Sequence, residues 1–313
     1  MRILLTSTSF QDTPGTHHDL LNSYDFIVDK LRGPLKEAVL LDVIDQYDGL
    51  ICGDDEITRA VIELGKKHKL KIISKYGIGL DKLDVDAAKE LGIPYENCPG
   101  VNKETVAEHV FALLLSFVKN IIPENAYLQN QKWVRMIGTD LFGKTIGIVG
   151  LGNVGKQVAI RAQAFGMTII AYDKYVDNDF AKANNIIYAN NVIEVLQKSD
   201  IISLNASLES GTKHMINIEQ LHNLKTGVII INTARAGLVE ENAVLVGIEK
   251  NIIRGYLTDV LDEEPMIPNH PFLNNSNIII TPHIGSRTYD NVVRQGTMAV
   301  ENLVKHIYNK KDV

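Results

Sequence analysis

The chain has 313 residues, of which 45% are hydrophobic and 22% are charged, and its formal net charge is −6. These values are ordinary for a globular protein of two domains, and the negative balance argues against nucleic acid as the main partner. Its two cysteines, Cys52 and Cys98, exclude a disulfide framework and a cysteine-based zinc site. No apolar run approaches the roughly 18 residues of a membrane span or forms a signal peptide, so we expect a cytoplasmic protein with no membrane partner.

The N-terminal third alternates short apolar runs with helical patterns. A strand is predicted at Arg2–Thr6, and a loop rich in turn formers at Gln11–His18. His17 and His18 in that loop are interpreted as solvated residues, the alternative being a metal-binding pair. The alternation predicts a parallel sheet flanked by helices. The further elements expected are strands near Leu50, at Lys71–Ser74 and at Ile93–Tyr95, and helices at Thr58–His68 and Val85–Leu91.

A loop with two glycines, Lys75–Asp81, follows one of these strands. The carboxyl ends of parallel strands form the edge at which open α/β sheets bind ligands. The backbone N–H groups of such a loop can hold a carboxylate. A plain turn is the alternative, and the spacing alone leaves both open.

An almost wholly apolar helix is predicted at Val106–Val118, with Asn102 as its N-cap. Such a helix is buried on several sides, and we expect it to run along a seam between two domains. The Pro99-Gly100 step before it is a natural hinge, and the last helix, from about Ser286 to Tyr308, is expected to return to the first domain. The predicted domains are 1–99 with 286–313 for substrate binding, and 100–285 for nucleotide binding.

The most informative motif lies at Thr145–Asp173. A β-branched run is followed by three glycines at G-x-G-x-x-G spacing, then by a helical pattern and a second strand that ends at an aspartate. The glycines permit a tight turn, a close approach to a pyrophosphate and close helix packing, and an acidic residue roughly 20 residues on binds a ribose 2′-OH and repels a 2′-phosphate. The stretch therefore predicts NAD rather than NADP, the alternative being a glycine turn with an incidental aspartate. The cofactor contacts predicted here are Gly150, Gly152, Asn153, Val154, Gly155 and Asp173.

Four further strands are expected in the second domain, at Asp200–Leu204, Val228–Asn232, Gly255–Asp259 and Asn277–Thr281. They complete an α/β fold of two doubly wound parallel-sheet domains, with a Rossmann-like nucleotide domain inserted into a flavodoxin-like substrate domain. Charged residues follow three of these strands directly. Such residues beside a dinucleotide site need a chemical role.

Hydride transfer between a nicotinamide and a 2-keto acid provides such roles. Arg235 offers a planar fork of donors that matches a carboxylate. His283 can give a proton to the developing alkoxide and take it back in the reverse direction. Glu264 is the carboxylate expected to bind the far nitrogen of that imidazole, which fixes its orientation and favours its protonated form. No metal is expected in this chemistry.

Four ordered segments, Ile72–Asp84, Asn97–Asn102, Gly143–Gly152 and Thr281–Gly285, resemble those of the D-isomer-specific 2-hydroxyacid dehydrogenases, and most closely the phosphoglycerate dehydrogenase branch. The resemblance extends over nearly the whole chain. It implies an NAD-dependent oxidoreductase that acts on a CH–OH group, a homodimer formed through the nucleotide domains, and closure of an interdomain cleft. It also implies substrate contacts from the Ile78 and Gly79 backbone, Arg235 and His283, an Asp259 near the nicotinamide amide, and cofactor contacts from Ala234 and Gly285.

The chain departs from the family pattern in three loops. It has Arg235-Ala236-Gly237 where Arg-Gly-Gly is usual, a change that is tolerated if Ala236 has a negative φ. Asn205–Leu208 lacks the usual x-Pro-Leu, which loosens the loop on the adenosine side. Ile51–Glu56 carries three carboxylates and no base, where phosphoglycerate dehydrogenases tend to place an arginine for the substrate phosphate. That loop disfavours a phosphate unless a base reaches it from elsewhere, the candidates being Lys75, Lys103 and Arg135 of the partner subunit.

Several functions remain open on the sequence. The substrate is either 3-phosphoglycerate or an unphosphorylated acid such as hydroxypyruvate, glyoxylate or pyruvate. A different class is an NAD(H)-binding corepressor or sensor, although the extended tails of such relatives and a regulatory domain are not expected here because the chain ends soon after its last helix. Formate dehydrogenase is disfavoured because that relative pairs its His with Gln, whereas position 264 is Glu. The reaction direction and any assembly beyond a dimer stay undecided.

Overall fold

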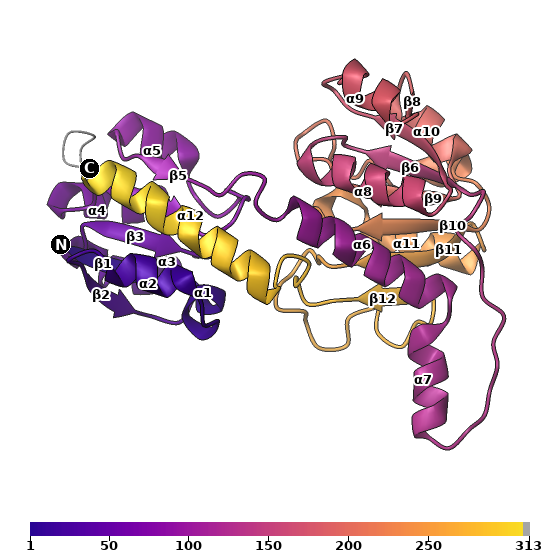
Figure 1. Cartoon of the computed structure of the whole chain (residues 1–313), viewed down its shortest axis with the longest axis horizontal. Helices are drawn as coiled ribbons and strands as arrows, with labels where there is room; N and C mark the ends of the chain where they lie inside the picture. Colours follow the sequence, from indigo (N-terminus) through magenta and orange to yellow (C-terminus); the bar gives the residue numbers. More distant parts are fainter. Residues whose placement is uncertain (309–313) are drawn as a thin grey trace. The chain divides into compact units, whose positions relative to one another are not determined.

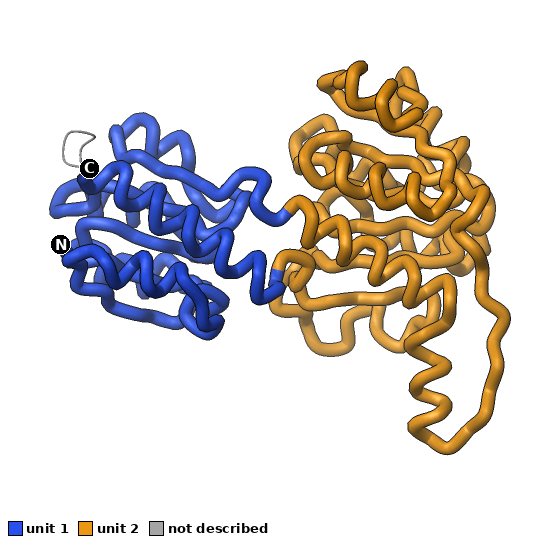
Figure 2. Tube along the Cα trace, viewed as in Figure 1, with its two compact units in different colours: residues 1–102, 287–313 blue, residues 103–286 orange. Residues whose placement is uncertain are grey.

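The structure is a computed structural model that describes residues 1–308. The chain divides into two compact units (Figure 2). Unit 1 comprises Met1–Asn102 and the chain from Arg287 onward, and unit 2 comprises Lys103–Ser286. Each unit is built around its own parallel sheet (Figure 1), which confirms the predicted fold class.

The sheet of unit 1 has the strand order β2-β1-β3-β4-β5 within residues 1–308, and every neighbouring pair is parallel. This is the doubly wound order of flavodoxin-like folds. Its strands are β1 (Arg2–Leu5), β2 (Ile27–Lys30), β3 (Gly49–Cys52), β4 (Ile72–Lys75) and β5 (Tyr95–Glu96). The helices of the unit are α1 (Thr8–Asp12), α2 (Thr16–Asn22), α3 (Glu37–Leu41), α4 (Arg59–His68), α5 (Val85–Leu91) and α12 (Tyr289–Ile307), with a 3₁₀ turn at Ile44–Gln46.

Successive residues of these strands are buried on opposite faces of the sheet. Leu4 and Leu50 pack in one core cluster with α3, α4 and α5, whereas Leu5 and Ile51 pack in another with α12. Side chains alternate between the faces of a strand, so a sheet covered on both sides needs apolar residues at nearly every position. The short, continuous apolar runs of the sequence meet that requirement.

The segment predicted as a loop at 11–18 is largely helical instead, because α1 and α2 occupy most of it. His17 is fully buried in α2, so the prediction that it is solvated was wrong. Its Nε2 lies 3.1 Å from the Phe10 carbonyl, and a Cβ added to Gly296 of α12 would lie 2.7 Å from its Cδ2. Burial lowers the pKa of His17. A glycine nearly the whole chain length away therefore makes the room for this ring.

The sheet of unit 2 has the strand order β12-β11-β10-β9-β6-β7-β8 within the described part of the chain, again all parallel. Counted from β6, this is the 3-2-1-4-5-6 order of dinucleotide-binding domains with one more strand at the edge. The strand order reverses between β6 and β9, which is where such sheets bind their ligands. The strands are β6 (Thr145–Val149), β7 (Thr168–Tyr172), β8 (Ile187–Tyr188), β9 (Ile201–Leu204), β10 (Val228–Asn232), β11 (Ile253–Thr258) and β12 (Ile278–Ile280).

Helices cover both faces of this second sheet. Ile146 and Ile231 pack with α6 and α8, whereas Ile202 and Ile230 pack with α10 and α11. The helices are α6 (Lys103–Val118), α7 (Ile121–Gln129), α8 (Asn153–Ala164), α9 (Asn178–Ala183), α10 (Val192–Lys198) and α11 (Glu241–Glu249), with 3₁₀ turns at Glu219–Asn223 and Ala236–Leu238. Among residues 1–308 no single helix is long and apolar enough to cross a membrane, and α6 and α7 reach that length and apolarity only as a pair bent by 60°.

Candidate active site

The glycine motif forms the turn from β6 into α8. Gly150 has a φ of 91°, and a Cβ there would lie 2.6 Å from the backbone nitrogen of Ala206. A Cβ on Gly155 would lie 2.0 Å from the Gly150 carbonyl oxygen, so neither position accepts a side chain. A Cβ on Gly152 would instead meet no atom within 4 Å, so the backbone there is open to a ligand. This cradle at a helix N-terminus fits a pyrophosphate.

Asp173 lies directly after β7 and beside the same turn. Its Oδ2 accepts a hydrogen bond of 2.6 Å from the Leu151 amide, and its Oδ1 accepts one of 2.7 Å from the Tyr175 amide. These bonds fix the carboxylate next to the glycine turn, where it fits a ribose 2′-OH and disfavours a 2′-phosphate. The structure therefore brings together the predicted cofactor residues of β6, α8 and β7.

Arg235 follows β10 in a turn that a buried amide holds in place. Asn232, the last residue of β10, has no exposed surface. Its Oδ1 accepts from the Ala234 amide at 3.1 Å, and its Nδ2 donates to the Arg235 carbonyl at 2.9 Å. Ala236 opens the 3₁₀ turn that follows and is not among the residues with a positive φ, so alanine fits where the family has glycine. The backbone of Arg235 is thus fixed while its side chain is left half-buried.

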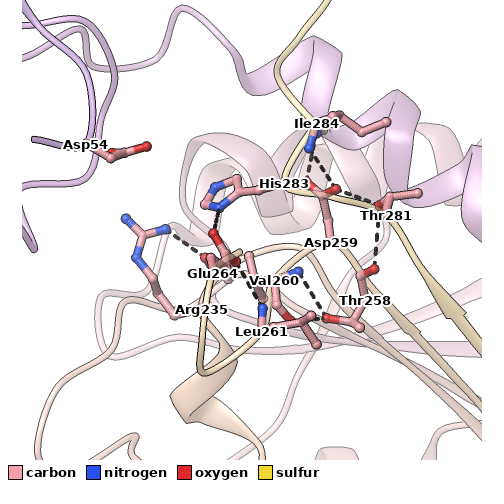
Figure 3. A network of polar contacts seen from close by, with 12 residues as sticks. Asp54, Arg235, Thr258, Asp259, Val260, Leu261, Glu264, Thr281, His283 and Ile284 are labelled. Atoms are coloured by element: carbon pink, nitrogen blue, oxygen red, sulfur yellow. Dashed lines mark hydrogen bonds and ion pairs between the residues drawn. The ribbon is translucent and has the colours of Figure 1, made fainter. Parts of the chain in front are cut away.

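Glu264 and His283 lie beyond the ends of β11 and β12 and form a pair (Figure 3). The Nδ1 of His283 lies 2.7 Å from Oε2 of Glu264, and Oε1 of Glu264 accepts from the Leu261 amide at 3.0 Å. The His283 side chain is 46% exposed and that of Glu264 is 39% exposed. Ion pairs this accessible add little to stability. Nδ1 faces the carboxylate, and Nε2 lies on the other side of the ring.

Asp259, at the end of β11, holds the loop that presents His283. Its side chain is 3% exposed. Its Oδ1 accepts from the Ile284 amide at 2.9 Å and from the Thr281 hydroxyl at 2.5 Å, and its Oδ2 accepts from the Gly285 amide at 2.7 Å (Figure 3). Burial alone would raise the pKa of Asp259, but these donors together with His109 hold it below its ordinary value.

The sequence interpretation missed the parts that His109 and Thr281 play in this group. His109 of α6 has its Nε2 3.0 Å from Oγ1 of Thr281 and 3.4 Å from Oδ1 of Asp259. A histidine inside a largely apolar helix was the signal available in the sequence. It pointed to a buried polar partner, although not to which one.

In unit 1, the loop after β4 is tied to the segment that follows β5. Asn97 Nδ2 donates to the Ile78 carbonyl at 2.7 Å, and the Cys98 amide donates to the Gly77 carbonyl at 2.8 Å. Gly77 has a φ of 143°, a backbone conformation that residues with a side chain rarely adopt. Ile78 is partly exposed. The loop is thus a braced turn at the carboxyl edge of its sheet.

The three carboxylates of the loop Ile51–Glu56 are buried or paired with lysines, so the loop is less negative toward a ligand than the sequence alone indicates. Asp55 is buried and acts as a brace, because it accepts from the Thr6 hydroxyl at 2.6 Å, the Leu35 amide at 2.6 Å and the Gly53 amide at 2.9 Å. It therefore adds no exposed negative charge to the loop. A carboxylate engaged in this way is structural rather than repulsive toward a ligand.

The other two carboxylates of this loop are paired with lysines. Glu56 lies 2.7 Å from Nζ of Lys36, whose hydrogen bond lowers the pKa of Glu56. Asp54 lies 2.6 Å from Nζ of Lys75, whose side chain is only 7% exposed. Lys75, one of the bases that the sequence analysis named as able to reach this loop, does reach it from β4. Its ammonium is balanced by Asp54 and also donates to the Gly53 carbonyl.

Comparison with known proteins places this site in a family. Residues 111–285, more than half of the chain, match the NAD binding domain of the D-isomer specific 2-hydroxyacid dehydrogenases. The chain belongs to this family. The predicted family, the oxidoreductase class and the NAD cofactor are thereby confirmed.

Its relatives within the family carry different names. The D-3-phosphoglycerate dehydrogenase of Methanocaldococcus jannaschii is 36% identical over 94% of this chain, which spans about half (56%) of that relative. The glyoxylate reductase of Korarchaeum cryptofilum is 34% identical over 88% of this chain and 84% of its own. The hydroxypyruvate reductase of Thermotoga maritima is 36% identical over 87% of this chain and 89% of its own.

Solved structures resemble the chain over nearly its whole length. A protein from Thermus thermophilus has a TM-score of 0.89 at 34% identity, with 98% of this chain and 97% of that one covered. The D-lactate dehydrogenase of Aquifex aeolicus, solved with NAD and lactic acid, has a TM-score of 0.84 at 26% identity, with 97% and 95% covered.

Proposed function

We propose that this chain transfers a hydride between NAD(H) and a small D-2-hydroxy acid or its 2-keto acid. The observation that carries the proposal is the 2.7 Å contact between His283 and Glu264 in the unit that also holds the glycine cradle. The residues concerned follow β6, β10, β11 and β12, so all of them lie at the carboxyl edge of one parallel sheet. That edge is where doubly wound sheets place both cofactor and chemistry.

Each charged residue has a defined part in this proposal. Arg235 binds the substrate carboxylate and orients the adjacent carbonyl. During reduction His283 donates a proton from Nε2 to the carbonyl oxygen as it becomes an alkoxide, and during oxidation it takes that proton back. Glu264 holds Nδ1 and stabilises the protonated ring. Bound NAD(H) supplies or accepts the hydride.

We assign substrate binding to unit 1, with the Ile78 and Gly79 backbone as substrate contacts, and NAD binding to unit 2. Within this class we favour an unphosphorylated acid such as hydroxypyruvate or glyoxylate. The support is the pair between Asp54 and Lys75, because it balances the lysine that would otherwise attract a phosphate. The second candidate is 3-phosphoglycerate, which the name of the Methanocaldococcus jannaschii relative suggests.

We further propose a cytoplasmic homodimer assembled through unit 2. Both cysteines are buried free thiols, which suits a reducing compartment. None of the residues of α7 is buried, and the chain after it exposes several large apolar side chains. Exposed apolar groups gathered in this way mark an interaction surface. The most exposed are Ile121, Ile122, Leu128, Trp133, Ile137 and Phe142. Equilibrium sedimentation is expected to give twice the chain mass of 34.8 kDa, and a monomer would contradict the proposal.

The experiment that tests the function is NADH oxidation by the purified protein with hydroxypyruvate, glyoxylate, pyruvate and 3-phosphohydroxypyruvate at matched concentrations. We expect turnover that is abolished in Arg235→Ala and that is faster with an unphosphorylated acid. Preference for the phosphorylated substrate would replace our substrate assignment with the second candidate. Tight NADH binding without any turnover would favour the NAD(H) sensor or corepressor.

A further inference from the structure

His109 occupies an unusual place for a polar side chain. It lies in the first two turns of α6, a helix whose buried residues are otherwise apolar apart from Thr105, and its side chain is 16% exposed. Its Nε2 lies 3.0 Å from Oγ1 of Thr281 and 3.4 Å from Oδ1 of Asp259. A buried polar group is costly unless it is partnered, so this position needs both contacts.

The partners of His109 hold the backbone next to His283. Asp259 accepts from the amides of Ile284 and Gly285, which directly follow the histidine. His283 itself has a φ of 53°, in the left-handed region that residues other than glycine seldom adopt. Such a conformation persists only where the surroundings impose it. The two hydrogen bonds that Asp259 accepts help to hold His283 in this conformation.

The packing around Gly285 shows how closely this group is assembled. A Cβ at Gly285 would lie 2.8 Å from Oδ2 of Asp259 and 3.3 Å from Cδ2 of His109. The loop therefore rests directly on the carboxylate and on the imidazole. Any shift of His109 or Asp259 reaches the backbone that carries His283.

We infer that His109 is a positioning residue for the reaction, which acts by holding Asp259 and Thr281 and thereby the backbone that aims His283 at Glu264. The inference rests on the proposed function for its kinetic consequence alone. As a donor from Nε2, His109 restrains the Asp259 carboxylate at Oδ1, the same oxygen that accepts from the Ile284 amide and the Thr281 hydroxyl. Without it, Asp259 is freer to turn, and the His283 ring loses its fixed distance to Glu264. Misplacement of a catalytic group by a fraction of an ångström lowers kcat more than substrate affinity.

Three variants test this inference. His109→Leu removes both ring nitrogens and keeps an apolar side chain, whereas His109→Gln retains an amide nitrogen that can donate to the same oxygens. Glu108→Gln is the matched control, because it alters the neighbouring residue of α6, which pairs with Arg161 at 3.0 Å. We expect kcat to fall about tenfold or more in His109→Leu, with KM and NADH affinity little changed, and to recover substantially in His109→Gln. Wild-type kcat in His109→Leu, or equal losses in both variants, would overturn the inference.

A readout independent of turnover is the imidazole ¹⁵N spectrum of histidine-labelled protein, with the His283 signals assigned from His283→Gln. We expect His109→Leu to shift the His283 Nδ1 resonance away from its carboxylate-bonded position, and Glu108→Gln to leave it in place. An unmoved resonance would refute the inference even if the wild type proves to lack dehydrogenase activity. Where His109→Leu fails to fold, Thr281→Val carries the same prediction, since it removes the hydroxyl that contacts both His109 and Asp259.

Discussion

Replacing Glu264 by Gln removes the negative charge beside the His283 imidazole and keeps an oxygen that can accept the same hydrogen bond. The bond is short, 2.7 Å from Nδ1 to Oε2, and both side chains are more than a third exposed. A charge-assisted hydrogen bond is about twice as strong as a neutral one, so the change loses about 1 to 1.5 kcal/mol before solvent screening is considered. Exposure places the effect at the lower end, ~1 kcal/mol, which corresponds to about a fivefold loss in rate.

The assay is steady-state NADH oxidation as a function of pH, with Glu264→Gln, Glu264→Ala and the exposed neighbour Glu263→Gln as a control. Loss of the carboxylate makes the protonated imidazole less stable, and reduction requires that form. The alkaline limb of the profile is therefore expected to move to lower pH by about 0.7 unit in Glu264→Gln. Glu264→Ala also loses the orientation of the ring and is expected to lose about 100-fold in kcat. Unchanged kcat and an unmoved alkaline limb in Glu264→Gln would refute this reasoning.

Three further predictions concern Asp173, the two cysteines and Asp259. In Asp173→Ala the carboxylate that faces the glycine turn is gone, so the ratio of kcat/KM with NADPH to that with NADH is expected to rise about tenfold or more; an unchanged ratio would exclude Asp173 from cofactor choice. Burial raises the pKa of Cys52 to about 12 and that of Cys98 to about 11. A thiol reagent at neutral pH is therefore expected to modify neither cysteine in the folded protein and both after denaturation. Rapid labelling of the native protein would contradict this prediction. The pKa of Asp259 is lowered in the folded protein, so its carboxylate stabilises the fold at pH values above the ordinary pKa of about 4 and loses this effect as the pH falls through the lowered pKa. In urea unfolding, Asp259→Asn is expected to be less stable than the wild type by ~1–3 kcal/mol at neutral pH, and the difference is expected to shrink in acid. A difference independent of pH would be inconsistent with that assignment.

The parallel sheets were predictable because their signals are local and repeat. The inner strands of a doubly wound sheet are buried on both faces, so β6, β10 and β11 are continuous apolar runs in the sequence whatever they pack against. The juxtaposition of Glu264 and His283 was predictable as well, although 19 positions separate them, because both follow parallel strands that end at one edge.

The errors concern residues whose environment is set from far along the chain. His17 stands among turn formers and looks solvated, yet the absence of a side chain at Gly296 creates the space that buries it. In the sequence Asp55 is one of three similar carboxylates. In the structure it is buried, and Thr6 and Leu35, from other parts of unit 1, donate the hydrogen bonds that satisfy it there. The partner of His109 could not be named because nothing in an apolar helix indicates which loop will cover it.

The central claim is that His283 and Glu264 serve a stereospecific reduction by NADH. The most direct test is the chirality of the glycerate formed from hydroxypyruvate, separated by chiral chromatography, for the wild type and for His283→Gln. We predict D-glycerate alone from the wild type, formed in step with NADH consumption, and none above background from the variant. Racemic or L-glycerate, or undiminished product from His283→Gln, would contradict the account.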